Sequence, residues 1–292
     1  MSWRTVIITT RCKLDLKMGY MVIRGEDTKR IFLDEIALLL IENPAVSLTG
    51  CLLEALVEKK IRVIFCDSKR SPMAELAPYY GSHDSSRKIR AQTAWTEAVK
   101  GTVWADIISE KIRKQADFLT ELGKYTESSL IRSYLGQIEL YDATNREGHA
   151  AKVYFNAVFG MDFTRSAECP ENAALNYGYG IILSAFNREI TACGYLTQLG
   201  IFHSNMFNHY NLSCDLMEPF RVLVDRQIRS MELSAFESRE KHTLWDVLNR
   251  YVRIDGSRQT VMNAIKIYSR SVFDALNDHD PSKIKFYSEI KE

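Results

Sequence analysis

The hydrophobic pattern changes its period near residue 80, and this change restricts the fold more than any other feature. From about residue 4 to residue 70, apolar residues alternate with polar ones or form short runs, a pattern typical of strands. These runs read TVIITT, KLDLKMGYMVIRG, RIFLDEIALLLIE and IRVIFCD. From Arg87 onward, apolar residues recur with the 3.6-residue period of helices, and the predicted helices include one over about 86–123 and one over about 281–290. The pattern predicts an α+β multidomain protein, in which a small β-sandwich-like domain precedes a larger all-α domain.

A turn-rich stretch, PYYGSHDSS, separates the two patterns and predicts a linker. We place the β domain at residues 1–78, the linker at 79–86 and the helical domain at 87–292. The 292 residues exceed the usual size of a single domain, which agrees with this division. Within the β domain we expect one short helix, LTGCLLEALVEKK, with Ser47 as its cap.

Composition excludes several classes of protein. The net charge is only +1, so the overall charge does not indicate nucleic-acid binding. The longest apolar run is too short to span a bilayer and no secretion signal is evident, so we expect a cytoplasmic protein without membrane contact. The six cysteines form no CxxC pair, which argues against a zinc ribbon. P-loop and GxSxG motifs are absent, so nucleotide hydrolysis and serine hydrolysis lack support.

The segment TNREGH opens a predicted helix and contains the first candidate residue, Glu147. Thr144 and Glu147 fit a capping box, in which the carboxylate bonds the cap backbone. Gly148 weakens the helix at the same turn, which indicates that another group approaches closely. Glu147 therefore either caps the helix or faces a functional site.

The segment LSCDLMEPFR, residues 212–221, places a proline inside a predicted helix. Pro219 lacks an N–H donor and is expected to kink the chain. Asp215 and Glu218 share a helical face, so their carboxylates repel unless a cation or an arginine lies between them. Arg221 could complete a surface cluster with no function. Alternatively, the break in the helix orients the side chain of Glu218 toward a functional site.

The segment GIFHSN contains the third candidate, His203, which follows a glycine turn. A lone histidine is more often a structural hydrogen-bonding residue than a ligand. Glu147, His203 and Glu218 together form a set of oxygen and nitrogen donors that suits a hard divalent ion, Mn²⁺ or Mg²⁺. They lie 56 and 15 positions apart, so only the fold can bring them together.

The chain resembles the Cas1 family, the integrases of CRISPR adaptation, in its type II branch and over essentially its whole length. The resemblance is carried by REGHAAKVYFNAVFG, GIFH, DLMEPFR, IRVIFCD and PYYGSHDSSRKI. It implies a homodimer built through the N-terminal domain, and a metal site with Glu147, His203 and Glu218 as ligands. Many relatives have Asp where this chain has Glu218, and type II relatives often have a histidine where it has Phe202.

The resemblance also implies the reaction and the partners. The 3′-hydroxyl of a captured DNA would attack a phosphodiester at the leader end of a CRISPR array, with Arg221, Arg146 and Arg87 as candidates for phosphate contacts. Expected partners are a small Cas2 subunit in a heterohexameric complex, double-stranded prespacer DNA, leader-repeat DNA, the type II effector nuclease and the ring-shaped type II-A adaptor.

Two other functions are open at this stage. One is a DNA-holding scaffold with a vestigial ion site, which would tolerate loss of the three ligands but not charge reversal at Arg221 or Arg87. The other is a metal phosphodiesterase that acts on branched DNA and needs no small partner subunit. We expect Asp215 to pair with an arginine rather than to touch the ion.

Overall fold

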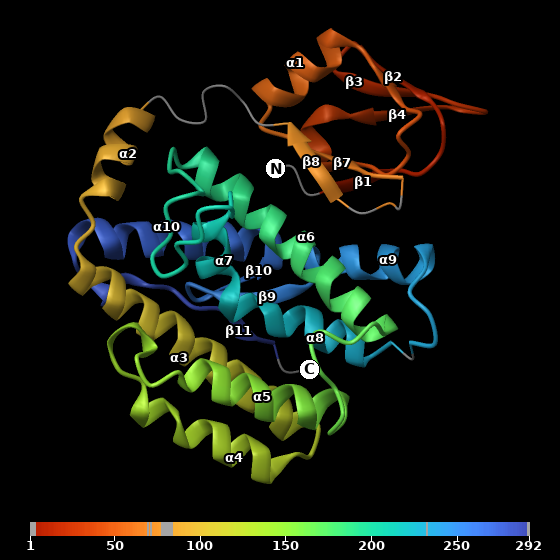
Figure 1. The fold of residues 1–292 in the computed structure, drawn as a ribbon. Helices are drawn as coiled ribbons and strands as arrows, with labels where there is room; N and C mark the ends of the chain where they lie inside the picture. The colour runs from red at the N-terminus through yellow and green to blue at the C-terminus, as the bar shows by residue number, and fades with distance from the viewer. Residues whose placement is uncertain (1–3, 69, 71, 77–83, 232, 291–292) are drawn as a thin grey trace. The chain divides into compact units, whose positions relative to one another are not determined.

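The structure, a computed structural model, describes residues 4–290 except 69, 71, 77–83 and 232. The chain divides into two compact units, Met1–Gly81 and Ser82–Glu292. The first unit is rich in strands and the second is mostly helical, which confirms the predicted α+β class (Figure 1). Most of the predicted linker lies outside the described residues, and residues 85 and 86 already belong to helix α2 (Ser85–Thr93).

Two four-stranded sheets build the first unit. One has the order β1-β5-β7-β8 and the other β4-β3-β2-β6. In the first sheet β1, β5 and β7 are parallel and β8 is antiparallel. The strands are β1 (Arg4–Ile8), β2 (Lys13–Lys17), β3 (Tyr20–Arg24), β4 (Thr28–Phe32), β5 (Ile36–Ile41), β6 (Ser47–Leu48), β7 (Arg62–Cys66) and β8 (Pro72–Leu76).

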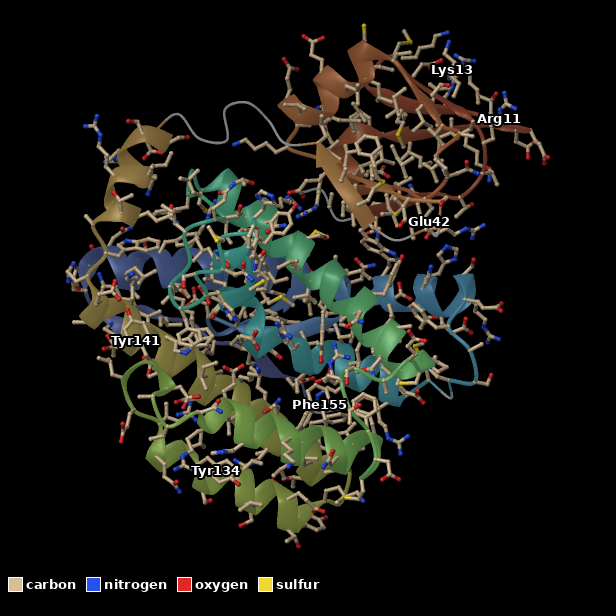
Figure 2. The ribbon with its side chains drawn as sticks, viewed as in Figure 1. Arg11, Lys13, Glu42, Tyr134, Tyr141 and Phe155 are labelled. Carbon is tan, nitrogen blue, oxygen red and sulfur yellow. The ribbon has the colours of Figure 1, made fainter. Side chains whose placement is uncertain are left out.

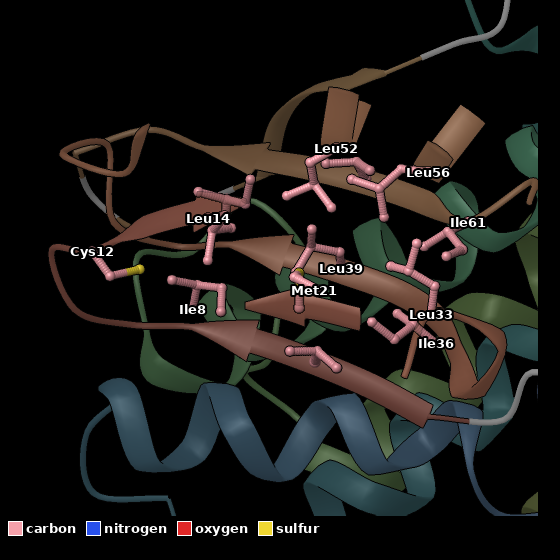
Figure 3. Packing of buried hydrophobic residues seen from close by; sticks show 13 residues of the cluster. Ile8, Cys12, Leu14, Met21, Leu33, Ile36, Leu39, Leu52, Leu56 and Ile61 are labelled. Atoms are coloured by element: carbon pink, nitrogen blue, oxygen red, sulfur yellow. The ribbon is translucent and has the colours of Figure 1, made fainter. Parts of the chain in front are cut away.

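Helix α1 (Gly50–Glu58) joins the two sheets in one apolar core. Leu14 and Leu39, one from each sheet, and Leu52 of the helix belong to this core and are fully buried (Figure 3). All residues of β5 are buried, as expected of a parallel strand covered on both faces. The helix is capped by the side chain of Thr49, which accepts a bond from the N–H of Leu52; the predicted cap, Ser47, lies in β6 instead.

Helices form most of the second unit, and the two longest are α3 and α6 (Figure 1). The predicted helix over 86–123 is divided in two because the side chain of Thr96 accepts a bond from the N–H of Val99 and starts a new helix. The further helices are α3 (Glu97–Glu121), α4 (Tyr125–Ser133), α5 (Arg146–Phe159), α6 (Pro170–Ala192), α7 (Asn211–Met217), α8 (Arg221–Arg229), α9 (Ser238–Trp245) and α10 (Val261–Asp278). None of the described helices is long and apolar enough to cross a membrane.

A small antiparallel sheet corrects the all-α prediction for this unit. Its order is β10-β9-β11, with β9 (Tyr251–Ile254), β10 (Ser257–Thr260) and β11 (Ser288–Glu289). Asp255 and Gly256 have φ values of +51° and +72° and form the two-residue turn between β9 and β10. The stretch 281–290, predicted to be helical, forms a 3₁₀ turn at Pro281–Lys283 and then β11.

A buried carboxylate ties α8 to two neighbouring helices. Asp225 accepts hydrogen bonds from the hydroxyl groups of Tyr154 on α5 (2.8 Å) and Tyr179 on α6 (2.6 Å). Burial raises the pKa of Asp225 to about 6, although both tyrosines and Arg221 favour its charged form. The hydrogen bonds therefore orient α8, whose first residue lies in the candidate site described below.

Asp225→Asn should make the protein less sensitive to pH between about 4 and 6. The pKa of Asp225 is higher in the folded protein than in the unfolded chain, so the protonated carboxyl favours the folded state. This contribution to stability is complete below about pH 4 and is lost as the pH rises through about 6. The free energy of unfolding of the variant, relative to wild type, should rise by roughly 2 kcal/mol across this range. Urea unfolding of both proteins at pH 4.5 and 7.5 measures this difference in free energy. A difference that is the same at both pH values would contradict the raised pKa of Asp225.

Candidate functional site

Glu147 lies in the first turn of α5 and does not cap it. Asp142 takes that role, because its two carboxylate oxygens accept the backbone N–H groups of Arg146 and Glu147, each at 2.8 Å. The hydroxyl of Thr144 instead donates to the carbonyl of Gln137. The capping-box interpretation is therefore wrong, and the carboxylate of Glu147 is available for other contacts.

The turn before α5 is strained. Tyr141, Asp142 and Asn145 all have positive φ values, of 58°, 50° and 51°. A Cβ on Gly148 would lie 2.6 Å from the side-chain oxygen of Asn145. The close approach that the glycine indicated is therefore made by the side chain of Asn145, which leads the chain into α5.

Glu218 sits where the helix breaks, as the proline predicted. Helix α7 ends at Met217, a 3₁₀ turn covers Glu218–Phe220, and α8 begins at Arg221. Glu218 is only 3% exposed, and its Oε1 forms an ion pair with the Arg221 guanidinium at 2.7 Å. The alternative of a surface cluster around a harmless bend is therefore wrong.

Asp215 positions the loop that carries His203. The Asp215 carboxylate is completely buried and accepts the backbone N–H groups of residues 201–203 at 2.6, 3.1 and 3.0 Å. It also lies 2.6 Å from Nδ1 of His203. Asp215 thus pairs with a histidine and the backbone, and the arginine partner that we expected is wrong. With Nδ1 engaged, Nε2 is the ring nitrogen that His203 can offer to a ligand.

Lys111 of α3 brings the two glutamates together. Its ammonium lies 2.5 Å from Oε1 of Glu147 and 2.5 Å from Oε2 of Glu218. The two carboxylates therefore converge on one point, although they lie far apart in the sequence. Among the described side chains, no three His, Cys, Asp or Glu residues stand in a metal-binding arrangement. The cation that the glutamates bind here belongs to the protein itself.

The charged groups of the site shift one another's pKa values. Burial disfavours the charge of Glu218, but Arg221 and Lys111 outweigh it and hold the pKa of this carboxyl below its usual value. The pKa of His203 is raised, chiefly by its bond to Asp215 and further by the charges of Glu218 and Glu147. All three predicted ligands therefore share one electrostatic environment.

A cavity of about 880 Å³ lies beside His203 and is lined by side chains of the loop 198–209 and of α3. The ring of Phe202 stacks on Trp104 at 4.5 Å, with 7° between the ring planes. Tyr141, which Figure 2 shows beside α3, also lines the cavity and donates a hydrogen bond of 2.7 Å to Glu97. His203 thus lines a space with both aromatic and amide walls, whereas Glu147, Glu218 and Lys111 are not among its lining residues.

The three arginines predicted to contact phosphate have different surroundings. Arg221 belongs to the site through Glu218, and its guanidinium lies 4.9 Å from the ring centre of Tyr179. Arg146 precedes Glu147 and lies 5.7 Å from the ring centre of Tyr134, labelled in Figure 2. Arg87 on α2 is exposed and pairs with Asp84. Arg221 thus pairs with a ligand candidate and Arg146 directly precedes one in the sequence, whereas Arg87 pairs with the residue before its own helix.

A role for Lys111 or Asp142 was not predicted from the sequence. A signal for Lys111 was present, because it follows Trp104 and Ile107 by seven and four positions and so shares their buried helical face. A lysine on such a face needs a partner of opposite charge. Asp142 gave no comparable signal, because it caps α5 from an irregular turn whose path depends on tertiary contacts.

The division into a strand-rich first unit and a mostly helical second unit agrees with the comparisons to known proteins. The family model described as CRISPR associated protein Cas1 matches residues 5–244. The chain belongs to this family.

Relatives and solved structures agree with this membership. The CRISPR-associated endonuclease Cas1 of Neisseria meningitidis serogroup C (strain 8013) is 34% identical over 226 residues, which cover 77% of this chain and 74% of the relative. A casposase bound to integration product has a TM-score of 0.76 at 18% identity, with 96% of this chain and 91% of that chain covered. A Cas6-RT-Cas1–Cas2 complex has a TM-score of 0.74 at 15% identity; the match covers 99% of this chain but 36% of that chain.

Proposed function

We propose that this chain is a divalent-metal-dependent DNA integrase of CRISPR adaptation, with Glu147, His203 and Glu218 as ligands for Mn²⁺ or Mg²⁺. One observation carries the proposal: the carboxylates of Glu147 and Glu218 meet at a single cation, the ammonium of Lys111. A point that holds one positive charge between two carboxylates suits a small hard cation. The relatives' names, endonuclease and casposase, support phosphodiester chemistry.

The donor set fits this kind of ion. Metal-bound histidines commonly give their second ring nitrogen to a carboxylate, and Asp215 holds Nδ1 of His203 in this manner. Two carboxylates and one imidazole suit Mn²⁺ or Mg²⁺ better than Zn²⁺, because zinc prefers more nitrogen or sulfur ligands in a closed tetrahedral site. A bound divalent ion would supply Lewis-acid activation of an attacking hydroxyl and neutralise charge on the phosphate.

The protein's own residues have separable roles in this proposal. Asp215 fixes the His203 loop and engages Nδ1 of the ring, so that Nε2 is the nitrogen that would bind an ion. Arg221 neutralises the second oxygen of Glu218 and brings a further positive charge beside the site, where a DNA phosphate would bind. No covalent protein–DNA intermediate is needed, because the 3′-hydroxyl of the DNA is itself the nucleophile.

Removing divalent ions with EDTA should abolish strand transfer, and Mn²⁺ should restore it. Glu147→Ala should weaken Mn²⁺ binding in calorimetry by at least about 30-fold and abolish strand transfer, because one of the oxygen ligands is lost. Glu168→Ala, which removes an exposed carboxylate before α6, is the matched control and should behave like wild type. Full strand transfer in EDTA, or by Glu147→Ala, would instead favour the DNA-holding scaffold.

The partners follow from the same proposal. One similar solved structure is a complex that contains Cas1 and Cas2, so we infer that this chain also works with a small Cas2 subunit, as a homodimer within a heterohexamer. Prespacer DNA and leader-repeat DNA are the expected substrates. Membership of the type II branch, and the effector nuclease and ring-shaped adaptor as partners, are predictions from the motifs. Dependence of strand transfer on the small subunit separates this function from a phosphodiesterase acting alone.

A further inference from the structure

Lys111 is a buried lysine with two buried or half-buried acidic partners. Its side chain is 10% exposed, and its ammonium is 2.5 Å from each of two carboxylates that come from different elements, α5 and the 3₁₀ turn. A buried ammonium needs such partners, because an unpaired charge in the interior is very costly. Conversely, Glu147 and Glu218 would repel each other across this space if the ammonium were absent.

The contacts of Lys111 use the oxygens that a metal ion would need. Oε1 of Glu147 and Oε2 of Glu218 bind the ammonium, while Oε1 of Glu218 binds Arg221. A protonated lysine has no lone pair and cannot itself be a ligand. The absence of a ready metal arrangement among the described side chains agrees with this occupation. Lys111 and a divalent ion would therefore compete for the same pair of carboxylates.

We propose that Lys111 is an internal counter-cation, which holds Glu147 and Glu218 together in the ion-free protein and gives up these contacts when a divalent ion binds. Lys111 then sets the affinity for the ion: it keeps the two carboxylates close in the ion-free site and also opposes binding. The competition with an ion rests on the proposed function, whereas the role in the ion-free protein does not.

The first test concerns the ion-free protein, in EDTA at pH 7.5. Lys111→Met should lower the thermal midpoint by about 5 °C or more, because it leaves two carboxylates facing each other. Adding Glu147→Gln to Lys111→Met should recover at least half of this loss, since it removes one of the two charges. Lost packing alone would give no recovery and would overturn the proposal.

Lys114 provides the matched control on the same helix. It is also buried, but its ammonium contacts Glu110 and the carbonyl of Tyr287 rather than the candidate ligands. Lys114→Met should lower the midpoint too, and Glu147→Gln should not recover that loss. Equal recovery in both backgrounds would mean that Glu147→Gln stabilises the protein generally and would overturn the proposal.

The second test measures Mn²⁺ binding by calorimetry. Lys111→Met should bind Mn²⁺ at least about tenfold more tightly than wild type, since the competing charge is gone. Lys114→Met should bind like wild type. Unchanged or weaker binding by Lys111→Met would show that Lys111 merely supports the ligands. If wild type and Lys111→Met both failed to bind Mn²⁺, the proposed function and the competition would fall, while the recovery measured in EDTA would still decide the role in the ion-free protein.

Discussion

Glu218→Gln should reduce strand transfer by about 1,000-fold or more. The substitution keeps the shape of the side chain but removes a charge that is 3% exposed and bonded to both Lys111 and Arg221. The amide cannot bind a divalent ion as strongly as a carboxylate, and it leaves the arginine uncompensated. Single-turnover transfer of a labelled duplex into a leader-repeat target, at saturating Mn²⁺, measures the effect.

Two controls separate this loss from misfolding. Glu168→Gln alters an exposed carboxylate and should retain the wild-type rate. The circular dichroism spectrum and DNA binding of Glu218→Gln should remain close to wild type, because the side chain keeps its volume. A folded variant with activity within tenfold of wild type would remove Glu218 from the proposed ligand set.

Gly200→Ala should reduce strand transfer by about 100-fold, although it changes the side chain of none of the candidate ligands. A Cβ at this position would lie 2.2 Å from the carbonyl oxygen of His203 and 2.7 Å from Oδ2 of Asp215. Backbone cannot yield as a flexible side chain does, so the loop 201–203 must shift away from the Asp215 carboxylate. A displacement of about 1 Å at a reacting group costs on the order of 100-fold in rate. The same transfer assay measures the loss.

Gly180→Ala is the matched control for this prediction. Gly180 lies within α6, and a Cβ there would meet no atom within 4 Å. The substitution should keep full activity and stabilise the protein by about 0.5–1 kcal/mol, because alanine favours the helix. Wild-type activity in Gly200→Ala, with both variants folded, would show that the loop adapts and that its position is not critical.

Periodicity and local chemistry predicted the main features of the fold. Alternating and 3.6-residue patterns depend on neighbours along the chain, so the β-rich first unit and the long helices α3 and α6 could be read directly. The break before Arg221 was also predictable, since Pro219 cannot continue the hydrogen bonding of a helix.

The errors arose where distant contacts decide the structure. Strand β11 has only two residues and exists because it pairs with β9, a partner more than thirty residues earlier. Its sequence alone resembled a helix end. The β9–β10 hairpin had a local signal, Asp255–Gly256, which the helical interpretation overlooked. Asp215 was given the wrong partner because His203 approaches it from another element.

The sequence by itself determined which residues could form a site: two acids, one imidazole that follows a glycine turn, and a proline that breaks a helix. It also determined that Lys111 lies on a buried helical face, because helical spacing sets which residues share a face. Only the tertiary structure decided what Lys111 meets there. The carboxylates of Glu147 and Glu218 reach its ammonium from α5 and the 3₁₀ turn, and elements so distant in the chain are brought together by packing.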